Sequence, residues 1–239
     1  MKIKSTAFLL TLAAVLTGHC LALTPIAEDF QASKLDKNRW YLYKTGKGRL
    51  VQSNGKLNFL VSAPTTSDYS TLELEESRPG IFEDWEMILD VSNSVKHKEG
   101  SQASCGFIIY NDQNILDYLY VNFFGKGGID AGAYNNGVYF PAKRLTVDAA
   151  VAKGAIRVSF SKKTKLMTFY ASLTNKEEGY EWIKVGTFAP VGAKKADVKA
   201  NWGMSSTEGL FGIQLTGFGI KQAVTSGQIN IDNFSLKAP

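Results

Sequence analysis

Short runs in which apolar and polar residues alternate recur along almost the whole chain, and this period of two is what most constrains its fold. Residues two apart in a strand point to the same side, so each run predicts a strand with one buried face. The clearest runs are 85–91, 118–123 and 156–160, and turn signals such as Asn54-Gly55 separate neighbouring runs. Convincing helical periodicity is lacking. About eleven or twelve regularly spaced strands are typical of a sandwich or barrel.

The last run contains a break in its alternation. Ile229 and Ile231 alternate with polar residues, but both Asp232 and Asn233 then precede Phe234. A one-residue slip inside a strand is what a β-bulge produces. We therefore expect a bulge at Asp232.

Residues 1–22 predict a signal peptide. Two lysines precede an apolar run that is too short to cross a bilayer, and Cys20-Leu21-Ala22 offers the small residues that a signal peptidase reads. We expect an exported protein, periplasmic or extracellular, whose mature part is a single β-sandwich domain over residues 23–239. Lipidation of Cys20 is the alternative, although His19 stands where a small residue is wanted. No later segment is long and apolar enough to span a membrane.

Composition excludes several classes of function. The mature chain of about 217 residues can bury a full core without disulfides. Its one cysteine, Cys105, alternates with Phe107 and Ile109, which is the pattern expected of a small buried residue. Removing the two signal lysines lowers the formal net charge from +5 to +3, too little to argue for nucleic acid or a membrane surface. His97, the one mature histidine, cannot by itself build a zinc site or a Ser-His-Asp triad.

Tyrosines and amides fall on the outward side of several predicted strands. In the run 118–123, Tyr118, Tyr120 and Asn122 alternate with the apolar residues and face outward together. An aromatic ring can cover the apolar face of a sugar while amides bond its hydroxyls. Outward tyrosines also pack across strands on any sheet, so an ordinary surface or a protein contact is the alternative. The candidate carbohydrate-binding residues are Tyr118, Tyr120, Asn122, Tyr139, Arg157, Tyr170 and Gln214.

Four motifs point to one fold family. They are Glu28-Asp29-Phe30 with Trp40, Gln52 to Leu57, the hairpin leading to Tyr180-Glu181-Trp182, and Ile229 to Phe234. In these motifs and in its order of strands the chain resembles the concanavalin A-like lectin and glucanase superfamily over essentially its whole mature length. The resemblance implies an all-β jelly-roll sandwich of two curved antiparallel sheets. Because its motifs are architectural, it bears on fold more than on function.

The resemblance also implies where a catalytic pair or a metal would lie. Hydrolases of the superfamily carry a Glu-x-Asp-x-x-Glu strand, and Glu73-Leu74-Glu75-Glu76 approaches it but lacks the central Asp and lies earlier in the chain. We therefore assign no catalytic residue. Jelly rolls resembling this one often hold a structural calcium that joins their two ends, and Asp232 with Glu28 is the candidate ligand pair. Otherwise Asp232 and Asn233 only hydrogen-bond the bulged backbone.

These observations predict a secreted, non-catalytic lectin-like domain that binds a polysaccharide or glycoconjugate on its concave sheet. One alternative is an atypical glycoside hydrolase or polysaccharide lyase that uses Glu73 and Glu75, which share a strand face. A second alternative is a structural protein of the envelope or matrix. We expect no nucleic-acid partner and no cofactor besides the possible calcium.

Overall fold

A computed structural model describes residues 23–125, 128–141, 152–191, 196–199, 201–204 and 209–239. The predicted signal peptide, residues 1–22, lies outside the described residues. Within these ranges the chain forms sixteen strands and no α-helix, so it offers no helix able to cross a membrane. The all-β prediction is confirmed. The strands outnumber the expected eleven or twelve partly because three of them are only two to four residues long.

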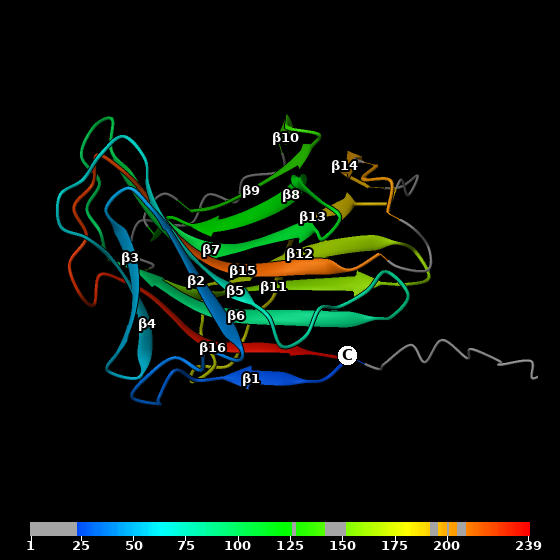
Figure 1. Ribbon diagram of the computed structural model, residues 1–239, viewed down its shortest axis with the longest axis horizontal. Coiled ribbons are helices and arrows are strands. Elements are labelled where there is room, and N and C mark those ends of the chain that lie inside the picture. Colours follow the sequence, from blue (N-terminus) through cyan, green and yellow to red (C-terminus); the bar gives the residue numbers. More distant parts are fainter. Residues whose placement is uncertain (1–22, 126–127, 142–151, 192–195, 200, 205–208) are drawn as a thin grey trace, which may run out of the picture.

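The strands form two sheets that face each other (Figure 1). The nine-stranded sheet contains β1 (Ile26–Glu28), β3 (Gly48–Ser53), β4 (Lys56–Val61), β6 (Trp85–Asn93), β11 (Lys153–Ser161), β12 (Leu166–Ser172), β13 (Ile183–Ala189), β14 (Val198–Lys199) and β16 (Ile229–Lys237). The seven-stranded sheet has the order β10 (Val138–Pro141), β9 (Ile129–Asn135), β8 (Asn114–Phe123), β7 (Gln102–Asn111), β15 (Phe211–Ile220), β5 (Asp68–Leu74) and β2 (Trp40–Thr45). Every pair of neighbouring strands is antiparallel except β13 with β14.

The inward-facing apolar residues of both sheets make one core. Trp85 on β6 lies 5.7 Å from the Phe160 ring and 5.6 Å from the Phe211 ring, so it joins two strands of its own sheet to β15 of the other. Each fully buried aromatic side chain contributes about 1.5–3 kcal/mol relative to exposure. Cys105 is also fully buried, which confirms the prediction of a small buried residue, and burial raises the pKa of its thiol.

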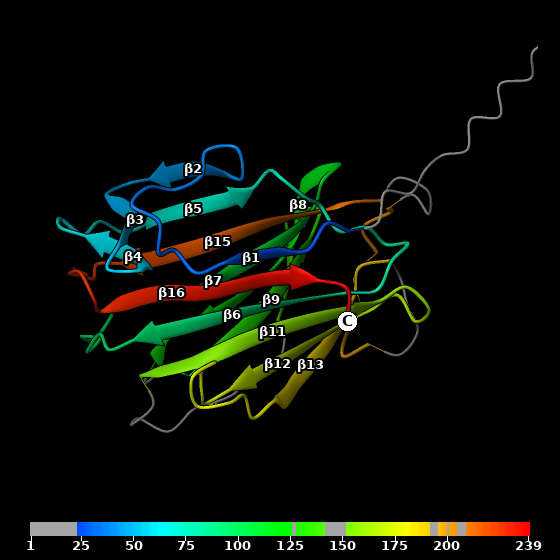
Figure 2. The same cartoon turned by 90° about the horizontal axis from the view of Figure 1, so that it is seen from below.

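The two ends of the domain meet in the nine-stranded sheet. β1 pairs with β16, and Figure 2 shows the two side by side. In the core, Trp40 packs between Phe30 and Phe234 with centroid distances of 6.4 and 5.3 Å. The pairing of β16 with β6 shifts register between Asp232 and Ser235, so the predicted bulge is confirmed.

The segment 173–182 differs from its prediction. We expected a strand from Tyr180, but β13 begins only at Ile183, and the residues before it fold back over the outer face of the nine-stranded sheet. The buried Asp90 carboxylate holds them there, because it accepts hydrogen bonds from the Tyr180 hydroxyl at 3.0 Å and the Lys176 backbone N–H at 3.2 Å. A buried carboxylate requires such donors, and the folded-back segment supplies these two in addition to the Asn233 side-chain amide, which donates at 2.9 Å.

Candidate functional site

Five of the seven predicted sugar-binding residues lie together on the outer face of the seven-stranded sheet. Their neighbours across the sheet follow from the strand register, which places Tyr118 opposite Tyr134 and Tyr134 opposite Tyr139. Their inward-facing neighbours along each strand fill the core. The five residues are Tyr118, Tyr120, Asn122, Tyr139 and Gln214.

A tyrosine cluster, formed by Tyr118, Tyr120, Tyr134 and Tyr139, covers β8, β9 and β10. The rings of Tyr118 and Tyr134 stack with centroids 4.4 Å apart and planes 16° apart, and Tyr139 follows at 5.2 Å from Tyr134. The Tyr120 and Tyr139 hydroxyls are 3.2 Å apart. Burial and this contact raise the pKa of Tyr120 above its ordinary value. The cluster is thus a partly exposed aromatic surface whose rings hold one another in place.

Two glycines let tyrosine rings lie flat on the sheet. A Cβ added at Gly132 would come within 2.6 Å of the Tyr120 hydroxyl oxygen, and one at Gly212 within 2.0 Å of the Tyr110 ring. Real Cβ atoms cannot approach so closely, so only glycine leaves room for these rings. The two rings therefore lie over the sheet rather than standing away from it.

A buried carboxylate, Glu73, lies near the middle of the same face. Its side chain accepts a short hydrogen bond from the Tyr110 hydroxyl, one from Gln214 Nε2 at 3.2 Å, and one from Arg78 Nη2 at 3.4 Å. Glu73 is only 7% exposed, so these donors replace the water that an ionised carboxylate needs. Burial and the contact with Glu73 raise the pKa of Tyr110, which keeps its hydroxyl as the donor.

A second aromatic group, the edge pair Tyr41 and Tyr43, lies on β2 at the opposite edge of the sheet. Their rings meet edge-on with centroids 4.5 Å apart, and they are 53% and 47% exposed. Register places Tyr41 directly opposite Glu73. Beside the tyrosine cluster on β8, Asn122 Oδ1 is buried and has no hydrogen-bond partner among the described residues. The face therefore combines aromatic edges with a polar centre.

The other two predicted residues, Arg157 and Tyr170, belong to the opposite side of the molecule. They lie on β11 and β12 of the nine-stranded sheet, and their side chains face outward there. The Arg157 guanidinium contacts the rings of Tyr170 and Trp182, at 5.0 and 5.8 Å from the centroids, and pairs with Glu86 at 2.8 Å. These contacts fasten the segment 173–182 to the sheet. The structure therefore does not bring the two residues to the site.

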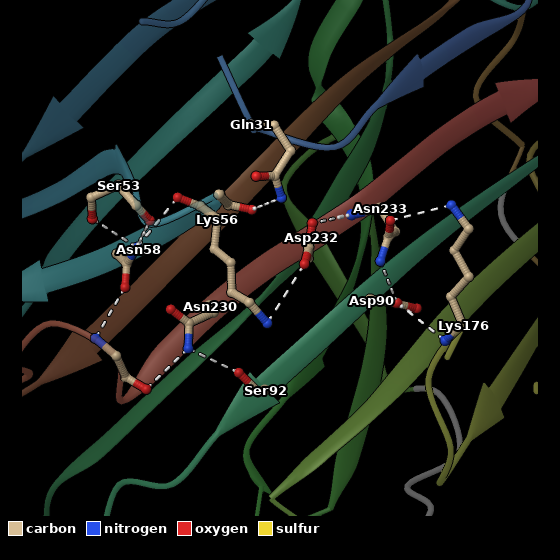
Figure 3. Close-up of polar contacts among 12 residues, drawn as sticks. Gln31, Ser53, Lys56, Asn58, Asp90, Ser92, Lys176, Asn230, Asp232 and Asn233 are labelled. Atoms are coloured by element: carbon tan, nitrogen blue, oxygen red, sulfur yellow. Dashed lines mark hydrogen bonds and ion pairs between the residues drawn. The ribbon is translucent and has the colours of Figure 1, made fainter. Parts of the chain in front are cut away.

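Figure 3 shows the surroundings of the bulge residue Asp232. One carboxylate oxygen accepts the Asn233 backbone N–H at 2.8 Å, and the other faces Lys56 Nζ at 3.6 Å. Asn233 itself donates to Asp90 at 2.9 Å. Burial, with the neighbouring Asp90 charge, raises the pKa of Asp232 although Lys56 opposes the shift. Lys56 thus supplies positive charge beside the bulge.

Glu28 does not share a site with Asp232. Its carboxylate accepts from Arg39 at 3.1 Å, Trp40 Nε1 at 3.3 Å and the Phe30 backbone N–H at 3.1 Å. Within the described ranges no three acidic, histidine or cysteine side chains gather as metal ligands. Because each carboxylate already faces its own cation, Glu28 and Asp232 do not fit a shared calcium ion.

The acidic pair Glu73 and Glu75 also has a cation between its members. Arg78 Nη2 lies 3.4 Å from a Glu73 oxygen and 4.0 Å from a Glu75 oxygen. A retaining hydrolase needs its two carboxylates about 5 Å apart with the scissile bond between them. Here a guanidinium fills that space.

Sequence reasoning missed Tyr110, Tyr134 and the edge pair. The alternation of Tyr41 and Tyr43 with Leu42 was a usable signal for an outward face. Tyr110 and Tyr134 carried no such signal, because Tyr110 ends an apolar run and Tyr134 follows a run of small residues.

No protein-family model and no curated protein matches this sequence. Solved structures do resemble the chain. The exoplasmic/lumenal domain of VIP36, solved in a Ca2+/Man2-bound form, matches with a TM-score of 0.53 and 12% identity over 91% of this chain and 89% of that one. Lectin UEA-II, complexed with galactose, matches with a TM-score of 0.56 and 12% identity over 90% and 98%.

An enzyme structure shows a similar level of likeness over part of its length. Xylan beta-1,4-xylosidase from Bacillus halodurans C-125 matches with a TM-score of 0.53 and 17% identity, over 88% of this chain but only 38% of the enzyme. Identities this low establish the fold alone. With its two antiparallel sheets and these lectin neighbours, the chain has the concanavalin A-like fold.

Proposed function

We propose that the chain is an exported, lectin-like domain that binds a polysaccharide or glycoconjugate on the outer face of its seven-stranded sheet. The observation that carries the proposal is the tyrosine cluster beside the hydrogen-bonding centre at Glu73 and Gln214. Sugars present apolar faces and hydroxyl rims, which aromatic rings and fixed polar groups match. VIP36 and UEA-II, which share the fold, were solved with sugars bound.

Binding of the wild-type protein to a broad glycan array tests this proposal. We expect Tyr139→Ala to weaken retention, because Tyr139 is 45% exposed and its loss removes a platform without opening the core. Tyr170→Ala is the matched control, since Tyr170 lies on the other sheet. If the wild type retains no glycan and pull-downs recover only protein partners, the structural-protein alternative replaces the proposal.

A glycoside hydrolase or polysaccharide lyase is the second candidate. It is favoured by the hydrogen bond between the Glu73 carboxylate and the Tyr110 phenol, residue types that serve as general acids and bases in enzymes, and by likeness to part of a xylosidase. Release of reducing ends or unsaturated products from a polysaccharide panel, abolished in Glu73→Gln and retained in Glu75→Gln, would promote it above the lectin-like function.

Export is the part of the proposal that rests on residues 1–22. Mass spectrometry of the full chain expressed in a secreting host tests it: a mature N-terminus at Leu23 supports a cleaved signal peptide. A lipid on Cys20 would instead establish the lipoprotein alternative. A structural calcium is compatible with the Ca2+-bound VIP36 neighbour, but we assign it neither Glu28 nor Asp232 for the reasons given above.

A further inference from the structure

The two aromatic groups on the seven-stranded sheet lie at opposite ends of one continuous face. Register joins them through a row of outward-facing residues that crosses the sheet at right angles to its strands. The row runs Tyr41, Glu73, Gln214, Ile108, Tyr120 and Gly132, on β2, β5, β15, β7, β8 and β9. The edge pair starts this row, and the tyrosine cluster surrounds its far end.

The length of the row sets the size of a ligand that uses both groups. Five strand spacings of about 4.8 Å separate β2 from β9, which gives a span of about 24 Å. A sugar unit in an extended chain is about as long as one strand spacing, so about five or six units cover the row. A monosaccharide or disaccharide can reach only one of the two groups.

The charge of the row indicates the class of glycan. Glu73 is the only Asp, Glu, Lys, Arg or His residue on it, and Arg78, the cation that contacts Glu73, is already shared by Glu73, Glu75 and Asp112. No cation on the row is therefore free to pair with a uronate or sulfate. Gln214, which is partly exposed, offers an uncharged side-chain amide, and such a group suits neutral sugar hydroxyls.

On these grounds, and resting on the proposed function, we infer that the ligand is a neutral, extended polysaccharide chain that lies across the strands and contacts both aromatic groups. The edge pair and the tyrosine cluster then act as two linked subsites, each contributing to the affinity for the same chain. Long chains bind more tightly than short ones for this reason.

Calorimetric titration with neutral β-linked oligosaccharides (cello-, xylo- and laminari-series, from disaccharide to octasaccharide) tests the inference. Affinity should rise up to a pentasaccharide or hexasaccharide and then level. Tyr41→Ala/Tyr43→Ala should lower the affinity for the hexasaccharide about tenfold, to that of a short chain, and leave the affinity for disaccharides unchanged. Tyr41→Phe/Tyr43→Phe, which keeps both rings, should bind as the wild type does, and Tyr170→Ala controls for the opposite face.

The outcomes separate this inference from the proposed function. A disaccharide that binds as tightly as the hexasaccharide, with no effect of the Tyr41→Ala/Tyr43→Ala change, overturns the extended-chain inference and leaves a sugar-binding site. Tighter binding of oligogalacturonates or alginate oligomers overturns the neutral class. Absence of binding to every oligosaccharide and to the glycan array overturns both the inference and the proposed function.

Discussion

Replacing Tyr110 by phenylalanine deletes one hydroxyl at the centre of the candidate site and little else. The ring keeps its place above Gly212, so no cavity opens. Glu73 loses its shortest hydrogen bond, while Gln214 and Arg78 still donate to it. Because Glu73 is almost fully buried, solvent cannot readily replace the missing donor.

The size of the effect follows from the chemistry of that hydrogen bond. A hydrogen bond to a charged group contributes about 1.5–3 kcal/mol net, so we expect the free energy of unfolding to fall by about 2 kcal/mol. In a domain of this size each kcal/mol shifts Tm by about 2–4 °C, so Tm should drop by about 4–8 °C.

Urea denaturation and calorimetry of the wild type and Tyr110→Phe measure this loss. Tyr41→Phe is the matched control, because its exposed ring lies on the same face and its change should stay within about 0.5 kcal/mol. The slope of the denaturation curve should not change. If Tyr110→Phe loses no more than Tyr41→Phe does, the hydroxyl does not support Glu73 and the central network is wrong.

Three further results are expected. Asp90→Ala should lower the free energy of unfolding by about 1–3 kcal/mol, since it leaves partly buried donors, including the Tyr180 hydroxyl, without their acceptor. Glycan binding on the opposite face should persist; urea titration and calorimetric binding check both results. Asp232→Ala should not change the difference between melting curves recorded with calcium and with a chelator, because Lys56 already faces Asp232; a chelator-induced drop in Tm that Asp232→Ala abolishes would show that calcium displaces Lys56. Burial raises the pKa of several tyrosines, Tyr120 among them, so the folded state holds these protons more tightly than the unfolded chain. This stability is present below pH 10 and is lost as pH rises through the folded-state values; unfolding free energies measured by urea titration should fall steeply above pH 10, and less so in Tyr120→Phe.

The sequence by itself determined most of the strands and the direction in which their side chains point. Alternation is a local property with a period of two, so Tyr118 and Tyr120 could be assigned to an outer face from six residues of sequence. The bulge at Asp232 was equally local, because one extra polar residue suffices to show it. The concanavalin A-like fold followed from strand order and architectural motifs.

Only the tertiary structure decided which outward residues share a face. Arg157 and Tyr170 have the same alternation as Tyr118, yet β11 and β12 belong to the nine-stranded sheet and β8 to the other. Alternation distinguishes inside from outside but carries no record of strand order across a sheet. The same holds for Glu73 and Gln214, which are 141 residues apart in the sequence but hydrogen-bonded in the structure. They meet because β5 and β15 are neighbours in the sheet, and the alternation within each strand does not specify which strands become neighbours.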